Sequence, residues 1–203
     1  GAFVQLSGVL KRVAVKLSKV CNDLRLLSSG PRAGIGEINL PAVQAGSSIM
    51  PGKVNPVIPE VVNQVAFEVI GNDITVTLAA EAGQLQLNAF EPVIAHSLFK
   101  SISHLAAACG TLAERCVRGI TANRERARRL LDDSTALVTA LNPYVGYARA
   151  SQIAKEALAT GKRVYDLVLE KNLMSREQLD AVMQPEVLTR PHYSTVHPPR
   201  SDA

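Results

Sequence analysis

Apolar residues recur at alternating spacings of three and four along the first part of the chain, at Leu10, Val13, Leu17, Val20, Leu24 and Leu27. Such heptad spacing is typical of a long helix that packs against another helix along one stripe. It returns at Leu98, Ile102, Leu105, Cys109, Leu112 and Cys116, and a shorter version runs through Ile58, Val62, Val65 and Val69. The predicted fold class is therefore all-α, built on a bundle of long helices, because no segment shows the alternation of a strand.

The predicted helices need further packing partners in addition to one another. A helix of about 25 residues is close to 40 Å long, which exceeds the width of a compact domain of this size. Further apolar residues widen the stripe beyond what one neighbouring helix covers, at Val9, Val15, Leu26, Val61, Phe67 and Phe90. We therefore expect the outer faces to pack on other copies of the chain. Gly71 and Pro92 fall inside the helical patterns, and each is expected to bend or break its helix.

Near residue 122 the long helical patterns end and shorter ones begin. They are predicted at 123–131, 134–141, 144–159, 164–171 and 175–183. Gly161 is placed to end one piece, and Ser175 with Gln178 has the spacing of a capping box at the start of another. The chain is thus divided into a central bundle portion, 1–121, and a small C-terminal helical domain, 122–203.

Composition narrows the class of protein. Of 203 residues, 47% are apolar, and 22 basic against 18 acidic side chains leave a net charge of +4, which is too small an excess to indicate nucleic-acid binding. No apolar run is long enough to span a membrane, so a cytoplasmic location is expected. The three cysteines are predicted to be buried thiols. The histidines lack metal-ligand spacing, so neither a metal nor another cofactor is expected.

Residues 28–53 interrupt the helical pattern with a high density of glycine and proline, which is typical of a binding loop. The loop leads into a predicted helix start, with Asn55 as the N-cap and Pro56 as the first helical residue. Unpaired N–H groups at a helix start attract an anion, and Lys53 adds a full positive charge. Ser47 and Ser48 would bring hydroxyl groups to that anion. Alternatively, the segment is an ordinary capped helix that follows a linker.

The run GSSIMPGKVNP, residues 46–56, resembles the signature of the fumarase and aspartase superfamily. The runs VCNDLRLLSSGPRAGIGEINLPAVQ, PEVVNQVAFEVIGND, EAGQLQLNAFEPVIAH, GITAN and LNPYVGY are similar to the same family. NPVIPEVVNQV and AAEAGQLQLN are closer to its ammonia-lyase branch than to its fumarase branch. The resemblance implies a C–N lyase that releases ammonia and fumarate from L-aspartate, and it implies a homotetramer that binds a small dicarboxylate.

The resemblance also implies roles for individual residues. Ser47 falls on the position of the general base that removes the Cβ proton, which gives a doubly charged enolate-like intermediate. Lys53 and Asn55 fall on positions that hold a substrate carboxylate. Backbone amides around Ser48, Ile49 and Met50 fall on the anion pocket. Glu60 matches an acidic residue that pairs with a histidine from elsewhere in the family's site, although a solvated Glu in the first helical turn is an equally simple interpretation.

The chain departs from the family in length. Family members are longer, and their preceding part carries motifs for the second carboxylate and the leaving group, in active sites assembled from three subunits. We therefore expect a fragment that is inactive by itself. Two alternatives stay open, which are a fumarase that hydrates fumarate to L-malate and a non-catalytic helical assembly module.

Overall fold

The computed structural model describes residues 1–44 and 54–189. Its contacts divide the chain into two compact units, Gly1–Asn123 and Arg124–Ala203. The sequence placed this division between residues 121 and 122. Each unit is described by itself.

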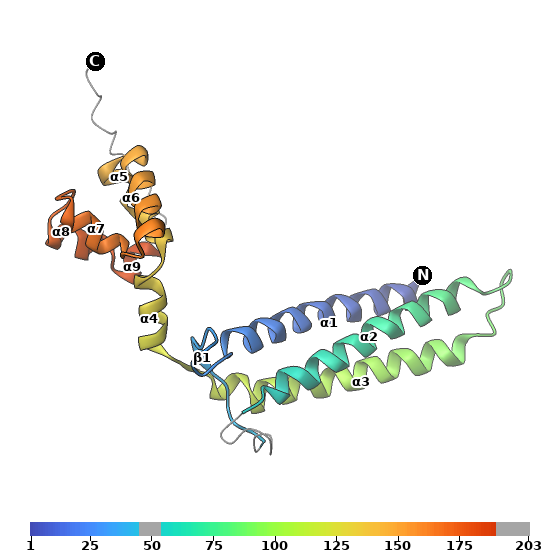
Figure 1. Cartoon of the computed structure of the whole chain (residues 1–203). Helices are drawn as coiled ribbons and strands as arrows, with labels where there is room; N and C mark the ends of the chain where they lie inside the picture. The colour runs from blue at the N-terminus through green and yellow to red at the C-terminus, as the bar shows by residue number, and fades with distance from the viewer. Residues whose placement is uncertain (45–53, 190–203) are drawn as a thin grey trace. The chain divides into compact units, whose positions relative to one another are not determined.

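Three long helices form the first unit, namely α1 (Ala2–Leu27), α2 (Val57–Glu81) and α3 (Glu91–Arg115). Helix α2 lies between the other two, which share few contacts with each other (Figure 1). The N-terminus and the turn between α2 and α3 lie at one end of this bundle, and the chain enters α2 at the other end (Figure 1). The helical fold class predicted from the heptad spacing is confirmed.

The heptad stripe is only partly covered in this unit. Leu10, Leu17 and Leu24 pack against the core clusters, whereas Val13 and Val20, from the same stripe, are exposed. The fully buried positions of α1 are instead small residues, namely Ser7, Ala14, Ser18 and Cys21. Small side chains let the backbones of α1 and α2 approach closely. Each outer helix is covered mainly by α2.

Polar side chains are buried between α1 and α2 near the middle and the end of the bundle. The Asp73 side chain, in a residue that is 5% exposed, accepts hydrogen bonds from Ser7 Oγ at 2.8 Å and from Lys11 Nζ at 2.6 Å. Asn63 Nδ2 donates to Ser18 Oγ at 2.8 Å and to the Asn22 side chain. These paired groups favour one alignment of α1 along α2, because a shift would leave them buried without partners.

The Asp73 contacts make the stability of the fold depend on pH. Burial would raise the pKa of Asp73, but the hydrogen bonds from Lys11 and Ser7 outweigh it and lower the pKa below its ordinary value of 3.8. A lowered carboxylate pKa adds stability that is fully present above the unfolded value and is lost as the pH falls through the folded one.

We expect the free energy of unfolding to fall steeply below about pH 4, and less steeply in Asp73→Asn, as measured by denaturant melts across pH. Asp23→Asn, which removes an exposed pair with Lys19, is the control. Identical acid slopes for Asp73→Asn and the unaltered chain would contradict this account.

Neither Gly71 nor Pro92 breaks a helix. Helix α2 continues through Gly71, because one glycine costs a helix interior only about 1 kcal/mol. Pro92 lies in the first turn of α3, where its missing N–H would have had no helical partner. The prediction of a break at Pro92 was wrong because the apolar pattern of the preceding turn resembled a continuing helix.

Residues 28–44 are tied to the end of the bundle by backbone hydrogen bonds. Glu37 N donates to Leu27 O at 3.0 Å, and Asn123 N donates to Glu37 O at 2.8 Å. Between these bonds, β1 (Ile38–Asn39) pairs antiparallel with β2 (Thr121–Ala122), Ile38 opposite Ala122. The sequence predicted no strands, because two residues are too few to show an alternation. A short 3-10 helix, η1 (Val117–Gly119), joins α3 to β2.

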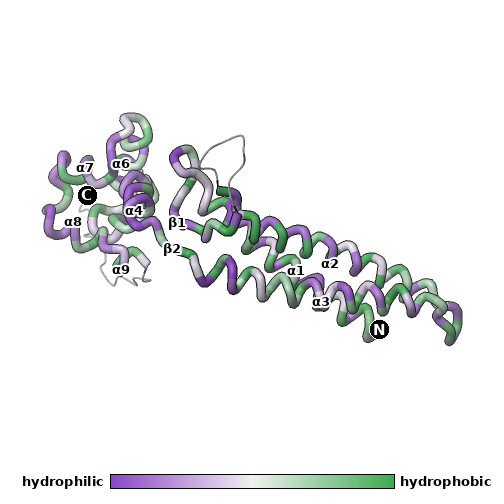
Figure 2. The backbone as a smooth tube through the Cα atoms, turned by 90° about the horizontal axis from the view of Figure 1, so that it is seen from below, coloured by the Kyte–Doolittle hydropathy of each residue, from purple (hydrophilic) through white to green (hydrophobic). Residues whose placement is uncertain are grey.

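The second unit consists of short helices around one core. They are α4 (Arg124–Asp132), the 3-10 helix η2 (Thr135–Leu141), α5 (Asn142–Val145), α6 (Tyr147–Thr160), α7 (Val164–Glu170), α8 (Arg176–Val182) and α9 (Pro185–Leu188). The core residues include Leu141, Ile153, Leu167 and Leu179. Helix α4 is mostly hydrophilic (Figure 2), with Leu130 and Leu131 near its end, and has no buried residue. The capping box of Ser175 and Gln178 is confirmed.

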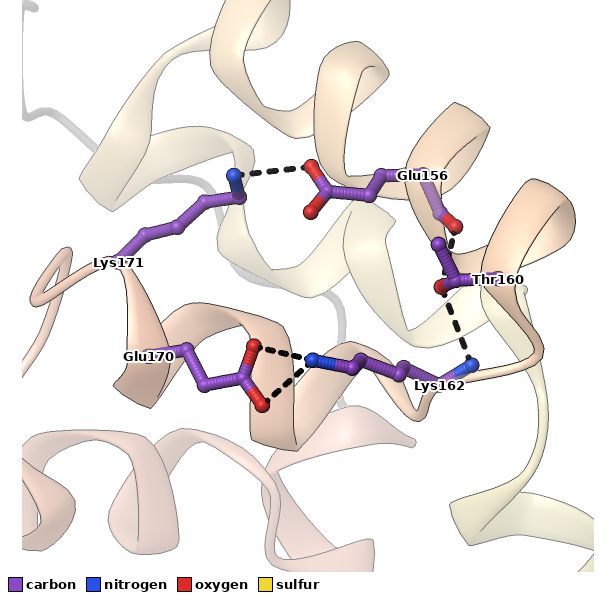
Figure 3. A network of polar contacts seen from close by, with 5 residues as sticks. All are labelled: Glu156, Thr160, Lys162, Glu170 and Lys171. Carbon is purple, nitrogen blue, oxygen red and sulfur yellow. Dashed lines mark hydrogen bonds and ion pairs between the residues drawn. The ribbon is translucent and has the colours of Figure 1, made fainter.

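A polar network closes the turn between α6 and α7 (Figure 3). Gly161 ends α6 in the left-handed conformation that glycine favours. The Thr160 hydroxyl donates to the Glu156 carbonyl and accepts from the Lys162 N–H. Lys162 Nζ bonds both oxygens of Glu170, and Lys171 Nζ lies 2.9 Å from Glu156. All of these side chains are exposed, so the network orders the turn and adds little stability.

Large apolar side chains are exposed on all three long helices. All six residues predicted to widen the stripe are exposed, including Phe67 at 61%. On α2, Phe67, Ile74 and Leu78 follow one another at spacings that place them on one side of the helix. Within the ranges that the structure describes, no helix is long and apolar enough to span a membrane.

Candidate functional site

The described part of the predicted site is the start of α2. Asn55 and Glu60 are both half-buried there. Asn55 is not the N-cap that the sequence predicted. Its carbonyl accepts from Val57 N–H at 2.9 Å in a tight turn, so the helix begins at Val57, and Pro56 occupies the capping position without a side-chain hydrogen bond. The Asn55 amide is therefore not engaged in capping the helix.

Glu60 lies in the first turn of α2, where the partial positive charge of the helix start favours a carboxylate. Its side chain makes no hydrogen bond or ion pair with any residue in 1–44 or 54–189. The Gln64 side-chain amide donates to the backbone carbonyl of Glu60 at 3.4 Å and leaves the carboxylate untouched. Within these ranges, the carboxylate is available for a partner from elsewhere.

Five of the predicted site residues lie outside the described residues. They are Ser47, Ser48, Ile49, Met50 and Lys53. The structure therefore brings together only the two segments that flank them. On one side lie Leu40, Pro41 and Val43, and on the other lie Pro56–Pro59.

These two flanking segments line the same small cavity. Cys116 and Arg115, at the end of α3, complete its lining. The cavity holds only about 10 Å³, room for one water molecule at most. A dicarboxylate does not fit there, so this cavity is not by itself a substrate site. The sequence did not predict that these segments line one cavity, because Pro41 and Cys116 lie far apart along the chain.

A larger pocket, of about 300 Å³, lies within the second unit. It contains none of the residues predicted to bind or react. Four of its five charged residues are engaged with neighbours, since Arg163 Nε lies 2.8 Å from Asp133, Arg128 Nε lies 2.8 Å from Asp132, and Tyr165 donates to Asp180. It is therefore not the candidate site.

The cysteines and the described histidines do not form a second site. Cys21 and Cys116 are buried as predicted, and burial, with the neighbouring Cys116 thiol, raises the pKa of Cys21 to about 11. Cys109 is exposed, so the prediction for it was wrong in this chain, because α3 packs mainly against α2 and leaves its other side open. His104 Nδ1 lies 2.5 Å from Glu68, which also pairs with Lys100. Across residues 1–44 and 54–189, no three potential ligands cluster to hold a metal.

Comparison with known proteins first defines the class. Residues 1–71 match a family described as Lyase, and residues 137–190 match one described as Fumarase C C-terminus. A crystal structure titled fumarate lyase:delta crystallin from Brucella melitensis, bound to cobalt, has a TM-score of 0.89 at 60% identity, over 94% of this chain and 41% of that one. These matches show that the chain is similar to helical proteins that are described as lyases and fumarases.

The relatives then define the family. Aspartate ammonia-lyase of Helicobacter pylori (strain 26695) is 62% identical over 197 residues, which are 97% of this chain and 42% of that protein. Class II fumarase from Schistosoma mansoni shares the fold, with a TM-score of 0.86 at 39% identity over 94% of this chain and 40% of that one. The chain belongs to the fumarase and aspartase superfamily. It spans about two fifths of the length of the curated relatives that it matches.

Proposed function

We propose that the chain is part of an aspartate ammonia-lyase, which converts L-aspartate reversibly to fumarate and ammonia. The observation that carries this proposal is 62% identity to an aspartate ammonia-lyase along nearly the whole chain, against 39% to a class II fumarase. The start of α2 supports it, because Asn55 and Glu60 stand there half-buried beside the signature run.

The reaction that we propose begins with removal of a proton from the substrate Cβ by Ser47. The electron pair left on Cβ is delocalised into the adjacent carboxylate, which gives the enolate-like dianion. This pair then forms the C–C double bond as the Cα–N bond breaks, and ammonia leaves. A serine hydroxyl is a weak acid, so Ser47 acts as a base only where donors or positive charges stabilise its alkoxide.

The remaining predicted residues hold the substrate in this proposal. Lys53 and Asn55 bind a carboxylate, and backbone amides around Ser48, Ile49 and Met50 stabilise the negative charge that develops in the transition state. Glu60 pairs with a histidine from elsewhere in the assembled site. Other segments and other subunits complete the site, so these 203 residues alone should have no turnover.

The assembly that we propose is a homo-oligomer, with a tetramer as the expected form. The exposed apolar residues along α1, α2 and α3 support it, because exposed apolar area of this extent marks an interaction surface. A cytoplasmic location stays a prediction.

The test needs a chain of the relatives' full length that carries these residues, here called the full-length enzyme. It is assayed with aspartate and with malate side by side, and fumarate is followed by its ultraviolet absorbance. We expect fumarate from aspartate. Faster release from malate would favour the fumarase alternative, and an assembled protein that is inactive on both would favour the helical module.

Replacing Lys53 should weaken substrate binding. Lys53→Met removes one charge-assisted hydrogen bond, so we expect a loss of about 2 kcal/mol, or roughly 30-fold in the dissociation constant of aspartate. Calorimetric titration of the full-length enzyme measures it. Lys162→Met, which removes a lysine paired with Glu170 in the second unit, is the control and should bind normally. Equal affinities in the two variants would mean that Lys53 does not contact the substrate.

A further inference from the structure

Both segments that flank residues 45–53 are anchored in one apolar cluster at the end of the bundle. Leu40 from one flank and Ile58 from the other pack against the same core of Cys21, Val62, Ala108, Leu112 and Cys116. The cavity between them is about 10 Å³, so the cluster is nearly filled. A filled apolar contact of this kind transmits displacement, because its parts cannot move independently.

Because Gly119 has no side chain, its backbone can lie close to the ring of Pro41, next to this cluster. A Cβ atom placed on Gly119 would lie 2.4 Å from Cγ of Pro41, well inside contact distance. Gly119 does not have a positive φ, so the restriction is one of space rather than backbone conformation. The proline ring is rigid, and the β1–β2 pair begins a few residues away on each strand. Neither side can therefore move aside without shifting backbone.

We infer that Gly119 is a positioning residue, whose contact with Pro41 sets the place of Asn55 and Glu60 for substrate. The path is short. Pro41 and Pro56 line the same cavity, and Asn55 immediately precedes Pro56. This inference rests on the proposed function for its consequence in catalysis, since Asn55 acts there on a carboxylate. A displacement of about 1 Å at such a residue costs on the order of 100-fold in rate.

The test is Gly119→Ala, with a rescue. In the full-length enzyme we expect kcat per assembled site to fall roughly 10- to 100-fold and the dissociation constant of succinate, a dicarboxylate that cannot react, to rise. Pro41→Ala deletes Cγ, so the double variant should recover both values. A defect in folding alone would lower the yield of assembled enzyme and leave both values per site unchanged. Gly110→Ala, where an added Cβ meets nothing within 4 Å in this chain, is the control.

A second measurement reports the position directly and needs no turnover. Hydrogen exchange of this chain should show faster exchange at the Val57 and Glu60 amides in Gly119→Ala, because these amides donate to Asn55 and Pro56 carbonyls. Pro41→Ala should reverse the change. The inference is overturned if exchange in Gly119→Ala matches Gly110→Ala, or if Pro41→Ala rescues nothing. A full-length enzyme without turnover whose exchange responds as expected would refute the proposed function and support the positioning contact.

Discussion

Ser47→Ala should nearly abolish the release of fumarate from aspartate by the full-length enzyme, while its assembly stays intact. In the proposed reaction Ser47 removes the Cβ proton, and a positioned base contributes about 10²- to 10⁴-fold to the rate. Alanine retains the backbone of the loop and deletes only the hydroxyl. The measurement is kcat for aspartate, together with sedimentation to verify the oligomer.

Ser48→Ala is the matched control for that experiment. In the proposal Ser48 contributes its backbone N–H, which alanine keeps, so the loss of kcat should be far smaller. Turnover close to that of the unaltered enzyme in Ser47→Ala would remove Ser47 from the mechanism. Equal losses of kcat in both variants would mean that the losses come from a disturbed loop rather than from removal of the Ser47 hydroxyl.

A charge on the outer face of α2 should dissociate the assembly. Phe67 and Ile74 are 61% and 60% exposed in the single chain, so Phe67→Asp or Ile74→Asp should change its own stability by only about 0.5 kcal/mol. At an apolar interface between copies, the same carboxylate would be buried without a partner, which is strongly unfavourable. We expect sedimentation to show a shift from the oligomer to smaller species.

Leu158→Asp serves as the control for this second experiment. Leu158 is 74% exposed and belongs to α6 in the second unit, not to any of the three long helices. Its variant should keep the oligomeric mass. An unaltered protein that sediments as a single chain, or a Phe67→Asp variant that stays assembled, would refute the proposed packing of the outer faces.

The heptad spacing predicted the long helices, but it could not predict which positions are buried. Leu10, Leu17 and Leu24 pack inward, whereas Val13 and Val20 from the same stripe are exposed. A period of seven gives the stripe, and the number of neighbouring helices decides how much of it is covered. The buried serines of α1 gave no apolar signal, because their burial depends on polar partners in α2.

The candidate site was predictable only in part, for a similar reason. The signature run and the helix start near Pro56 are local patterns, so Asn55 and Glu60 could be placed at the beginning of α2. The N-cap was misplaced by one residue, because the turn at Asn55 competes with capping. The contact between Pro41 and Gly119 joins distant segments and leaves no local pattern.

The pairing of β1 with β2 also bears on the order of folding. Asn39 is made long before Thr121, its partner 82 residues later. Closing a loop of that length is entropically costly, and it becomes favourable once α2 and α3 have packed as a hairpin that brings the two strands together. The β1–β2 pair is therefore expected to form after α2 and α3 have packed, and during synthesis it cannot form until Thr121 and Ala122 have left the ribosome.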